Sequence, residues 1–396
     1  MSDEQRLRQL QQRLSSLSPT RREALERAMR ERDVKAPTAR PTPKPPRRTR
    51  RGSSTMDFSL FFFSGDGSVQ RPDNYRLLLD SAEYADRNGY SAIWVPERHF
   101  VDFGGLYPNP SVLAAAIAVR TERIQIRAGS VAVPLHHPVR LAEEWSVVDN
   151  LSGGRVAIAC ASGWHPDDFV IAPGGRARYA ARKDDMFDAI ELVQRLWAGE
   201  TVDVDGVPVR TLPRPRQSRL PLWISSQGSV DTFVRAGEIG ANVLTGLVAQ
   251  RPADLRDKIT AYREALKEAG HSDGRVTAMV HTFLGADEDE VREQVREPLI
   301  GYLRTFLAQQ GNFDSQYNEL DDAGREAMLA ATFDRYFESL ALLGTPDKGE
   351  SLVEDLVDLG VDEAACLVDF GLEPETVLAG LRQLTELKDR YRGARP

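Results

Sequence analysis

Side chains that could do chemistry gather directly after apolar runs of the chain. Segment 160–169 (CASGWHPDDF) follows the apolar run 156–159, and Glu97, Arg98 and His99 follow another apolar run. Thiol, imidazole and carboxyl groups can serve as nucleophile, general base or proton shuttle. Either segment could instead be a salt-bridged or capped loop, and for isolated residues that simpler interpretation is favoured. The choice between a catalytic site and a structural loop therefore depends on the strands and helices that position these residues.

A third group is the turn 225–229 (SSQGS), which leads from an apolar run into a helical pattern. Free N–H groups and the positive dipole at a helix N-terminus favour phosphate binding. An ordinary helix cap explains the same residues equally well. His136 and His137 are adjacent, but neighbouring side chains point apart and no third ligand stands at a recognised spacing. Capping and packing roles are favoured for both, and no metal site is predicted.

Apolar runs and amphipathic patterns alternate along most of the chain, as in a parallel α/β fold. We expect strands at 58–63, 91–95, 124–131, 156–160, 222–225, 242–245, 276–282 and 364–370. We expect helices at 73–88, 109–121, 138–150, 180–198, 229–239, 252–269 and 286–309. Extra segments are a small hairpin with a Pro/Arg-rich loop at 200–220 and added helices at 311–343. This alternation predicts a (β/α)8 TIM barrel with insertions, with a doubly wound open sheet as the alternative.

The first 55 residues differ in composition from the rest. They hold 15 Lys/Arg against 6 Asp/Glu, in a chain whose net charge is −8, so the body is strongly acidic. Segment 1–33 reads as a short helical piece, 34–55 as a basic Pro-rich linker, and 56–390 as the barrel domain. The acidic body argues against a nucleic-acid-binding core, and docking or tethering by the tail both stay open.

Cysteine usage and hydropathy limit the cellular compartment in which we expect the protein. The chain has two cysteines, Cys160 and Cys366, and no apolar run long enough to span a membrane. A reducing cytoplasm and no membrane partner are therefore expected. No G-x-G-x-x-G after a strand, P-loop, H-E-x-x-H or C-x-x-C occurs, so the chain has no recognisable site of its own for ATP or a Rossmann-bound nicotinamide.

Four segments in order give the chain a resemblance to the bacterial-luciferase-like flavin monooxygenases. They are 89–100 (GYSAIWVPERHF), 137–144 (HPVRLAEE), 148–155 (VDNLSGGR) and 343–346 (LGTP). Segments 161–169 (ASGWHPDDF) and 179–183 (YAARK) look like the subgroup found in nonribosomal peptide and polyketide assembly lines. Segment 17–25 (LSPTRREAL) is similar to helical pieces that border assembly-line modules.

The resemblance implies a TIM barrel that uses reduced FMN, supplied by a separate flavin reductase, together with O2. By position, Cys160 and Ser162 would lie closest to the flavin ring. Ser130 would lie in a strand bend that often holds a non-proline cis peptide, and Arg182 with the 226–229 turn would hold the phosphate. The full set of implied cofactor-binding residues is Ser130, Cys160, Ser162, Tyr179, Arg182, Ser226, Gln227, Gly228 and Ser229.

The implied roles near the substrate carry one departure from the family pattern. Luciferases have two histidines after the glutamate, and Arg98 replaces the first of them. His99 matches the second and is the expected base or orienting group, with Cys160 as a second catalytic candidate that could equally pack as a small hydrophobe. Arg98, Trp164 and His165 would face the substrate, whereas Asp167 and Asp168 would cap and anchor the loop.

The first functional hypothesis is a monooxygenase that hydroxylates nitrogen or carbon of an acyl or aminoacyl group in natural-product biosynthesis. Oxygen insertion beside a carbonyl is a variant of it. The substrate would be tethered to an acyl or peptidyl carrier protein, and a homodimer through helices beside the second and third strands is a mild expectation. Two alternatives stay open: an oxidoreductase that uses deazaflavin F420, and a non-catalytic scaffold whose basic tail docks partners.

Overall fold

The computed structural model describes residues 55–65, 72–226, 228–247, 252–309 and 320–392. The expected helical segment 1–33, nearly all of the linker 34–55, and Gln227 lie outside these ranges. Among the described residues, no helix is both long and apolar enough to cross a membrane.

Eight parallel strands form a closed ring. In chain order they are β1 (Asp57–Phe61), β2 (Ala92–Val95), β3 (Gln125–Ala132), β4 (Val156–Ala161), β7 (Leu222–Ser225), β8 (Asn242–Gly246), β9 (Val276–Leu284) and β11 (Glu363–Leu367). The ring closes because β11 pairs with both β1 and β9. The predicted (β/α)8 barrel is confirmed, and the open sheet is excluded. A short strand that the sequence did not indicate, β10 (Leu342–Gly344), adds to β9.

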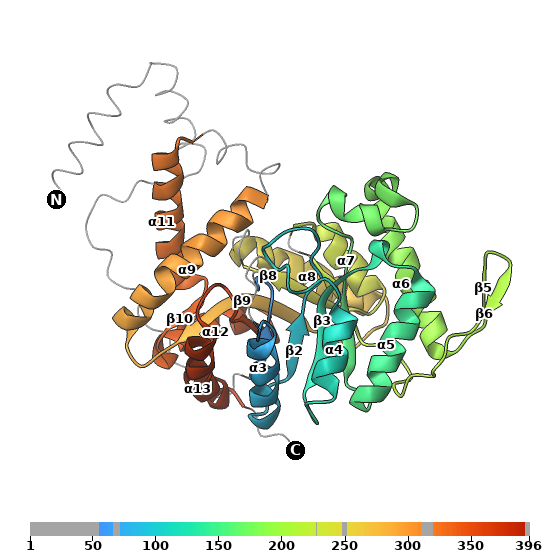
Figure 1. Cartoon of the computed structure of the whole chain (residues 1–396), viewed down its shortest axis with the longest axis horizontal. Coiled ribbons are helices and arrows are strands. Elements are labelled where there is room, and N and C mark those ends of the chain that lie inside the picture. The colour runs from blue at the N-terminus through green and yellow to red at the C-terminus, as the bar shows by residue number, and fades with distance from the viewer. Residues whose placement is uncertain (1–54, 66–71, 227, 248–251, 310–319, 393–396) are drawn as a thin grey trace, which may run out of the picture. The chain divides into compact units, whose positions relative to one another are not determined.

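Helices follow most strands and surround the ring in Figure 1. They are α3 (Arg76–Arg87), α4 (Pro110–Ala118), α5 (Pro138–Ser152), α6 (Arg182–Ala198), α7 (Val230–Glu238), α8 (Pro252–Glu268), α9 (Glu288–Gln309), α11 (Asp322–Ser339), α12 (Pro346–Leu359) and α13 (Pro374–Arg390). Short 3-10 turns are η1 (Val133–Leu135), η2 (Pro166–Ile171) and η3 (Gly175–Ala181), and β5 (Val202–Val204) pairs with β6 (Val207–Val209) as the expected hairpin. The sequence reading had assigned no helix to the ranges of α12 and α13.

Two apolar cores follow from the alternation of side chains along each strand. On β4, Val156, Ile158 and Cys160 pack outward against the helices. Ala157 and Ala159 belong instead to the core inside the ring. Apolar residues of α9 and α11 join that inner core, so these two helices pack against the barrel interior as well as against each other.

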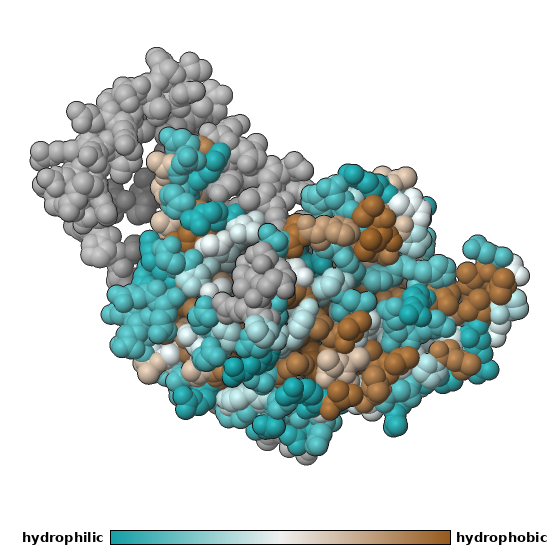
Figure 2. Space-filling model, viewed as in Figure 1, coloured by the Kyte–Doolittle hydropathy of each residue, from teal (hydrophilic) through white to brown (hydrophobic). Residues whose placement is uncertain are grey.

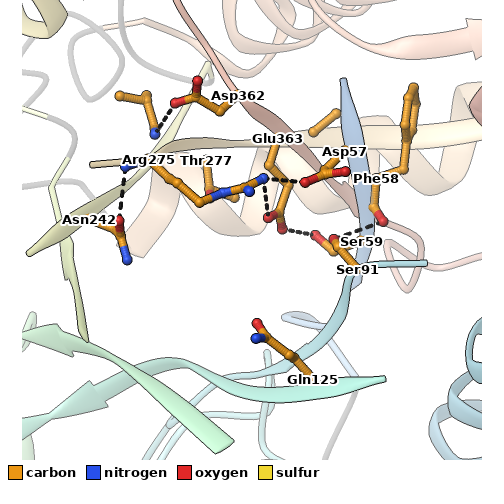
Figure 3. A network of polar contacts seen from close by, with 12 residues as sticks. Asp57, Phe58, Ser59, Ser91, Gln125, Asn242, Arg275, Thr277, Asp362 and Glu363 are labelled. Carbon is orange, nitrogen blue, oxygen red and sulfur yellow. Dashed lines mark hydrogen bonds and ion pairs between the residues drawn. The ribbon is translucent and has the colours of Figure 1, made fainter. Parts of the chain in front are cut away.

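The strands begin at an end of the barrel that is rich in ion pairs (Figure 3). Glu363, fully buried, accepts hydrogen bonds from Arg127 Nη1 at 2.9 Å and from Ser59 Oγ at 2.6 Å. Arg275 pairs with Asp57 and lies 3.6 Å from Glu363. The guanidinium of Arg127 also stacks between two indole rings of the inner core. Every charge named here therefore has an opposite charge close to it.

Candidate active site

The carboxylate of Glu97 organises the opposite end of the barrel, where β2 ends. Its Oε1 lies 2.9 Å from His99 Nε2 and 2.7 Å from His136 Nε2. Its Oε2 accepts a hydrogen bond of 2.7 Å from the backbone N–H of Ala132, at the end of β3. The carboxyl side chain is 1% exposed. One buried group thus ties together the loops that follow two neighbouring strands.

Burial and hydrogen bonding have opposite effects on the pKa values of Glu97 and His136. Burial by itself would raise the pKa of Glu97, but hydrogen bonds from His136, His99 and Ala132 outweigh it, and the pKa is lowered. Burial would lower the pKa of His136, but its bond to Glu97 outweighs that effect and raises it. Glu97 is therefore an anion at neutral pH, and its contact with His136 favours the imidazolium form.

Arg98 points into an aromatic cage. Its guanidinium carbon lies 4.4 Å from the ring centre of Trp164, 5.0 Å from that of Phe63 and 5.3 Å from that of Phe103. Burial lowers the pKa of Arg98 to about 10, which still leaves it charged at neutral pH. The structure thus brings two residues expected on the substrate side, Arg98 and Trp164, into direct contact.

The loop after β4 supplies Trp164 to this cage. Phe169 of the same loop is buried against Leu135 and Tyr179, and a side chain at Gly163 would collide with the Phe169 ring. Burial raises the pKa of Asp168, although His99, His165 and Arg98 are near enough to act against that shift. Asp168 therefore lies within electrostatic reach of His99 and Arg98.

His165 and Asp167 lie at the outer edge of that loop. His165 is about half exposed and caps η2 by accepting a hydrogen bond from Asp167 N–H. Asp167 forms an ion pair with Arg176. The expected anchoring role of Asp167 agrees with this geometry, whereas the substrate role of His165 has no contact here that supports it and stays a prediction.

Cys160 faces away from the barrel interior. It packs in the outer core with Ile158 and is 1% exposed. Burial raises the pKa of the thiol far above its usual value, so the reactive thiolate is suppressed. Of the two interpretations open from the sequence, packing as a small hydrophobe fits this environment. Contact with a flavin or a catalytic role for Cys160 stays a prediction that the packing does not favour.

The bend at the end of β3 has the expected backbone. The peptide bond between Gly129 and Ser130 is cis, and the register between β3 and β4 shifts between Gly129 and Val131. A Cβ at position 129 would lie 2.8 Å from the Phe61 ring, so only glycine fits there. The role of Ser130 beside a flavin ring stays a prediction.

The starts of two helices supply hydrogen-bond donors that could bind a phosphate group. Arg182 begins α6, stacks 4.1 Å from the Tyr179 ring centre, and has a buried Nε that no acceptor meets within the described residues. Ser229 stands at the N-cap of α7 without capping it through its side chain. An ion pair of 2.9 Å between Asp184 on α6 and Arg235 on α7 holds the two helices side by side.

These groups fit an anion such as the phosphate of FMN, because a guanidinium Nε and uncapped N–H groups are all donors. Ser226 donates its backbone N–H to Leu244 O and is partly buried, and Gly228 is exposed. Ser162 is partly buried after β4. Gln227 lies outside the described residues, so its predicted role has no structural counterpart here.

The two adjacent histidines have different roles. His137 caps α5 by accepting a hydrogen bond from Val139 N–H, as expected. His136 instead contacts Glu97, so the expected capping and packing role was wrong for it; the backbone turn through η1 brings its ring back towards β2. Across the described part of the chain, no group of three or more His, Cys, Asp or Glu residues is arranged to hold a metal ion.

Sequence reasoning also missed a carboxylate after β11. Asp369 accepts hydrogen bonds from the backbone N–H groups of Phe63, Ser64 and Gly65 and from Tyr107 Oη. It fixes the loop after β1, which carries Phe63 into the aromatic cage. A lone acidic residue at the end of an apolar strand was the available signal.

Comparison with known proteins agrees with this geometry. Residues 56–363 match the family described as luciferase-like monooxygenases. The chain is 30% identical to a 4-hydroxyprotoasukamycin monooxygenase of Streptomyces nodosus subsp. asukaensis, a match that covers 57% of this chain and 62% of that protein. It is also 30% identical to the oxygenase component of a flavin-dependent trigonelline monooxygenase of Acinetobacter baylyi, over 62% of this chain and 70% of that protein.

Solved structures share the fold. The oxygenating constituent of the 3,6-diketocamphane monooxygenase of Pseudomonas putida, in complex with FMN, superposes with a TM-score of 0.69 at 19% identity, covering 84% of this chain and 97% of that one. An F420-dependent secondary alcohol dehydrogenase superposes with a TM-score of 0.63 at 17% identity, covering 86% of this chain and all of that one. At these identities the superpositions establish the barrel alone, and the family follows from the sequence match. The chain belongs to the luciferase-like monooxygenase family of flavin-dependent enzymes.

Proposed function

We propose that this chain is the oxygenase component of a two-component system that uses reduced FMN and O2. The observation that carries a phosphate-bearing cofactor is the donor set formed by Arg182 Nε and the uncapped start of α7. The match to a flavin-dependent oxygenase component favours FMN over deazaflavin F420. A relative named as an oxygenase component supports a separate flavin reductase as partner. When bound, the flavin would supply the redox chemistry that side chains lack.

The residues of this chain would hold and shield the reactants. Arg182 and the first turn of α7 would bind the phosphate, and Ser130 would lie beside the ring. The aromatic cage around Arg98 would exclude water from the site. Glu97, by accepting from His99, would fix the imidazole ring so that it can orient or move a proton at Nδ1.

The substrate side of the proposal is an acyl or aminoacyl group carried on an acyl or peptidyl carrier protein and hydroxylated at nitrogen or carbon, with oxygen insertion beside a carbonyl as a variant. Its support is the sequence resemblance to assembly-line enzymes and the natural-product relative. The basic segment 34–55 would tether the barrel while it reaches the carrier. The cytoplasmic setting inferred from cysteine usage stays a prediction.

We further propose a homodimer through α4 and α5. Val112, Val119, Val147 and Leu151 are exposed on or beside these neighbouring helices. In Figure 2 brown surface is prominent over this part of the molecule. Light scattering should give twice the chain mass, and Val147→Lys with Leu151→Lys should give the monomer. A monomeric wild-type chain would contradict the proposal.

The cofactor can be identified by absorbance. Oxidised FMN shows two visible absorption bands. Deazaflavin F420 shows a single band at about 420 nm, because its ring system differs from that of a flavin. Titration with each cofactor, oxidised and reduced, separates the first proposal from the F420 alternative. Binding of neither would favour a non-catalytic scaffold.

Oxygen transfer is tested by mass spectrometry of acyl and aminoacyl carrier proteins after incubation with FMN, a reductase and ¹⁸O2. A gain of one labelled oxygen is expected, and fragmentation locates it. No gain on any carrier, with a gain on a free small molecule, would remove the tethered-substrate part and keep the monooxygenase.

A further inference from the structure

Three buried polar atoms at the active-site end of the barrel have no hydrogen-bond partner among the described residues. They are Nε2 of His281 and the hydroxyl oxygens of Tyr302 and Tyr336. Their residues are 1%, 4% and 1% exposed, respectively. An unpaired buried polar group is costly, and in native proteins it calls for a water, a ligand or another explanation.

The three side chains meet although they come from different elements. The His281 ring on β9 packs edge-on against Tyr302 of α9 at 4.4 Å between ring centres. It packs against Tyr336 of α11 at 5.8 Å. His281 lies on the same face of β9 as Met279 and Phe283 of the inner core. It pairs with Leu367, the last residue of β11, so it lies towards the end of the barrel where the strands finish.

The surroundings of this polar trio are aromatic and continuous with the cage of Arg98. Tyr302 packs edge-on against Phe103 at 5.1 Å and stacks on Phe306 at 6.1 Å. Phe306 in turn lies 6.0 Å from Trp164. In the closed ring, β9 stands four strands from β3 in both directions, so the trio lies across the barrel from Ser130. The polar trio therefore faces the proposed flavin from the far wall of the same mouth.

Each member of the trio is uncharged at neutral pH. Burial lowers the pKa of His281 to about 3 and raises the pKa of both Tyr302 and Tyr336 well above the usual value of a phenol. The trio thus offers two hydroxyl donors and one neutral imidazole in an apolar setting. A charged ligand group would lose its hydration there without gaining an opposite charge from the trio.

We propose that His281, Tyr302 and Tyr336 bind a neutral oxygen of the substrate, a carbonyl or hydroxyl group carried on a flat apolar body that the aromatic wall accommodates. This deepens the proposed function, because it rests on that function for the identity of the occupant as the oxygenated substrate. The hydrogen bonds themselves require neither flavin nor oxygen.

The test is calorimetric titration of the full chain, without flavin, with three probes of nearly equal shape: 2-acetylnaphthalene, 2-ethylnaphthalene and 2-naphthoate. The acetyl probe is expected to bind about threefold to tenfold more tightly than the ethyl probe, the range that one net hydrogen bond gives. Naphthoate is expected to bind more weakly than the acetyl probe. In Tyr302→Phe and Tyr336→Phe the preference for acetyl over ethyl should shrink.

Thermal unfolding separates this role from a structural one. Since neither hydroxyl has a hydrogen-bond partner in the described part of the chain, their removal should leave the melting temperature unchanged or higher. Tyr262→Phe is the matched control, because Tyr262 is equally buried but donates to Ala241 O at 2.9 Å. That variant should melt at a lower temperature and keep the wild-type preference among probes.

Several results would overturn the subsite: no binding of any probe, equal binding of the acetyl and ethyl probes, strongest binding of naphthoate, or a preference that survives both tyrosine substitutions. A chain that shows the acetyl preference but binds no FMN would keep the subsite and reject the proposed function. A chain that oxygenates a substrate but does not prefer the acetyl probe over the ethyl probe would keep the proposed function and reject the subsite.

Discussion

The Arg127–Glu363 pair at one end of this barrel and the polar trio at the other differ in how far their buried polar groups are satisfied. Where the strands begin, Arg127 and Glu363 pair at 2.9 Å and Ser59 adds a further hydrogen bond. Where the strands end, His281 and Tyr302 are as deeply buried but have no partner among the described residues. Satisfied networks favour one folded state, whereas unsatisfied groups are tolerated where a ligand completes them. We therefore expect the Arg127–Glu363 pair to contribute mainly to stability and the trio to contribute mainly to ligand binding.

The largest expected effect is on stability, at the beginning of the strands. Arg127→Met leaves the carboxylate of Glu363 buried without its main counter-charge, and the free energy of unfolding should fall by about 3–5 kcal/mol. Urea denaturation measures it. The double variant Arg127→Met with Glu363→Leu removes both charges and should recover most of the loss. If Arg127→Met is as stable as the wild type, the Arg127–Glu363 pair does not stabilise the fold.

At the end of the strands the corresponding carboxylate should matter for activity. Glu97→Gln keeps the shape of the side chain but removes the charge and the acceptor that His99 and His136 share. Oxygenation should fall roughly 10²-fold, as for loss of an acid–base or orienting group. Steady-state turnover measures this, with Glu143→Gln, a partly exposed glutamate on α5, as control. Unchanged turnover would show that the cluster is structural.

The proposed binding site for the FMN phosphate can be tested by substituting Arg182. Arg182→Met removes the buried Nε donor and should weaken FMN binding about tenfold or more, the effect of a hydrogen bond to a charged group. Fluorescence titration of FMN gives the affinity. Arg176→Met, an exposed arginine in the same loop region, is the control and should bind normally. If Arg182→Met also binds normally, the phosphate lies elsewhere.

The contact between Glu97 and His136 predicts a pH dependence of stability. A histidine whose pKa is raised by folding stabilises the protein fully below its unfolded pKa of 6.5, and this contribution is lost as pH rises through the raised value. The unfolding free energy of the wild type, minus that of His136→Gln, should therefore decrease as pH rises from 6.5 upward. An increase over that range would reverse the assigned charges.

The smallest effect is expected at Cys160. Because its thiol packs among the outer apolar residues, Cys160→Ala should lower the unfolding free energy by about 1 kcal/mol through a small cavity. Turnover should stay within about twofold of wild type, since the side chain points into the outer core and its truncation leaves the groups of the site in place. A large loss of turnover in a folded variant would restore the catalytic interpretation of this cysteine.

Much of the fold was predictable because it is encoded locally. The strand at 156–160 and the helix at 138–150 lie within two residues of β4 and α5, since apolar runs and the Pro138 start are visible in the sequence. The ranges of α12 and α13 were left unassigned. The site was harder: His136 and His137 have the same chemistry and adjacent positions, and only the chain turn through η1 separates their roles.

Local patterns in the sequence were sufficient to indicate the family, the order of the eight barrel strands, and which loops follow them. They also marked Glu97, Arg98 and His99 as a polar group at the end of an apolar run. Three features required the folded chain: Cys160 faces the helices, Glu97 contacts His136, and His281 meets Tyr302 and Tyr336. Direction and contact between residues far apart in the chain depend on ring closure and strand register, which local patterns do not encode.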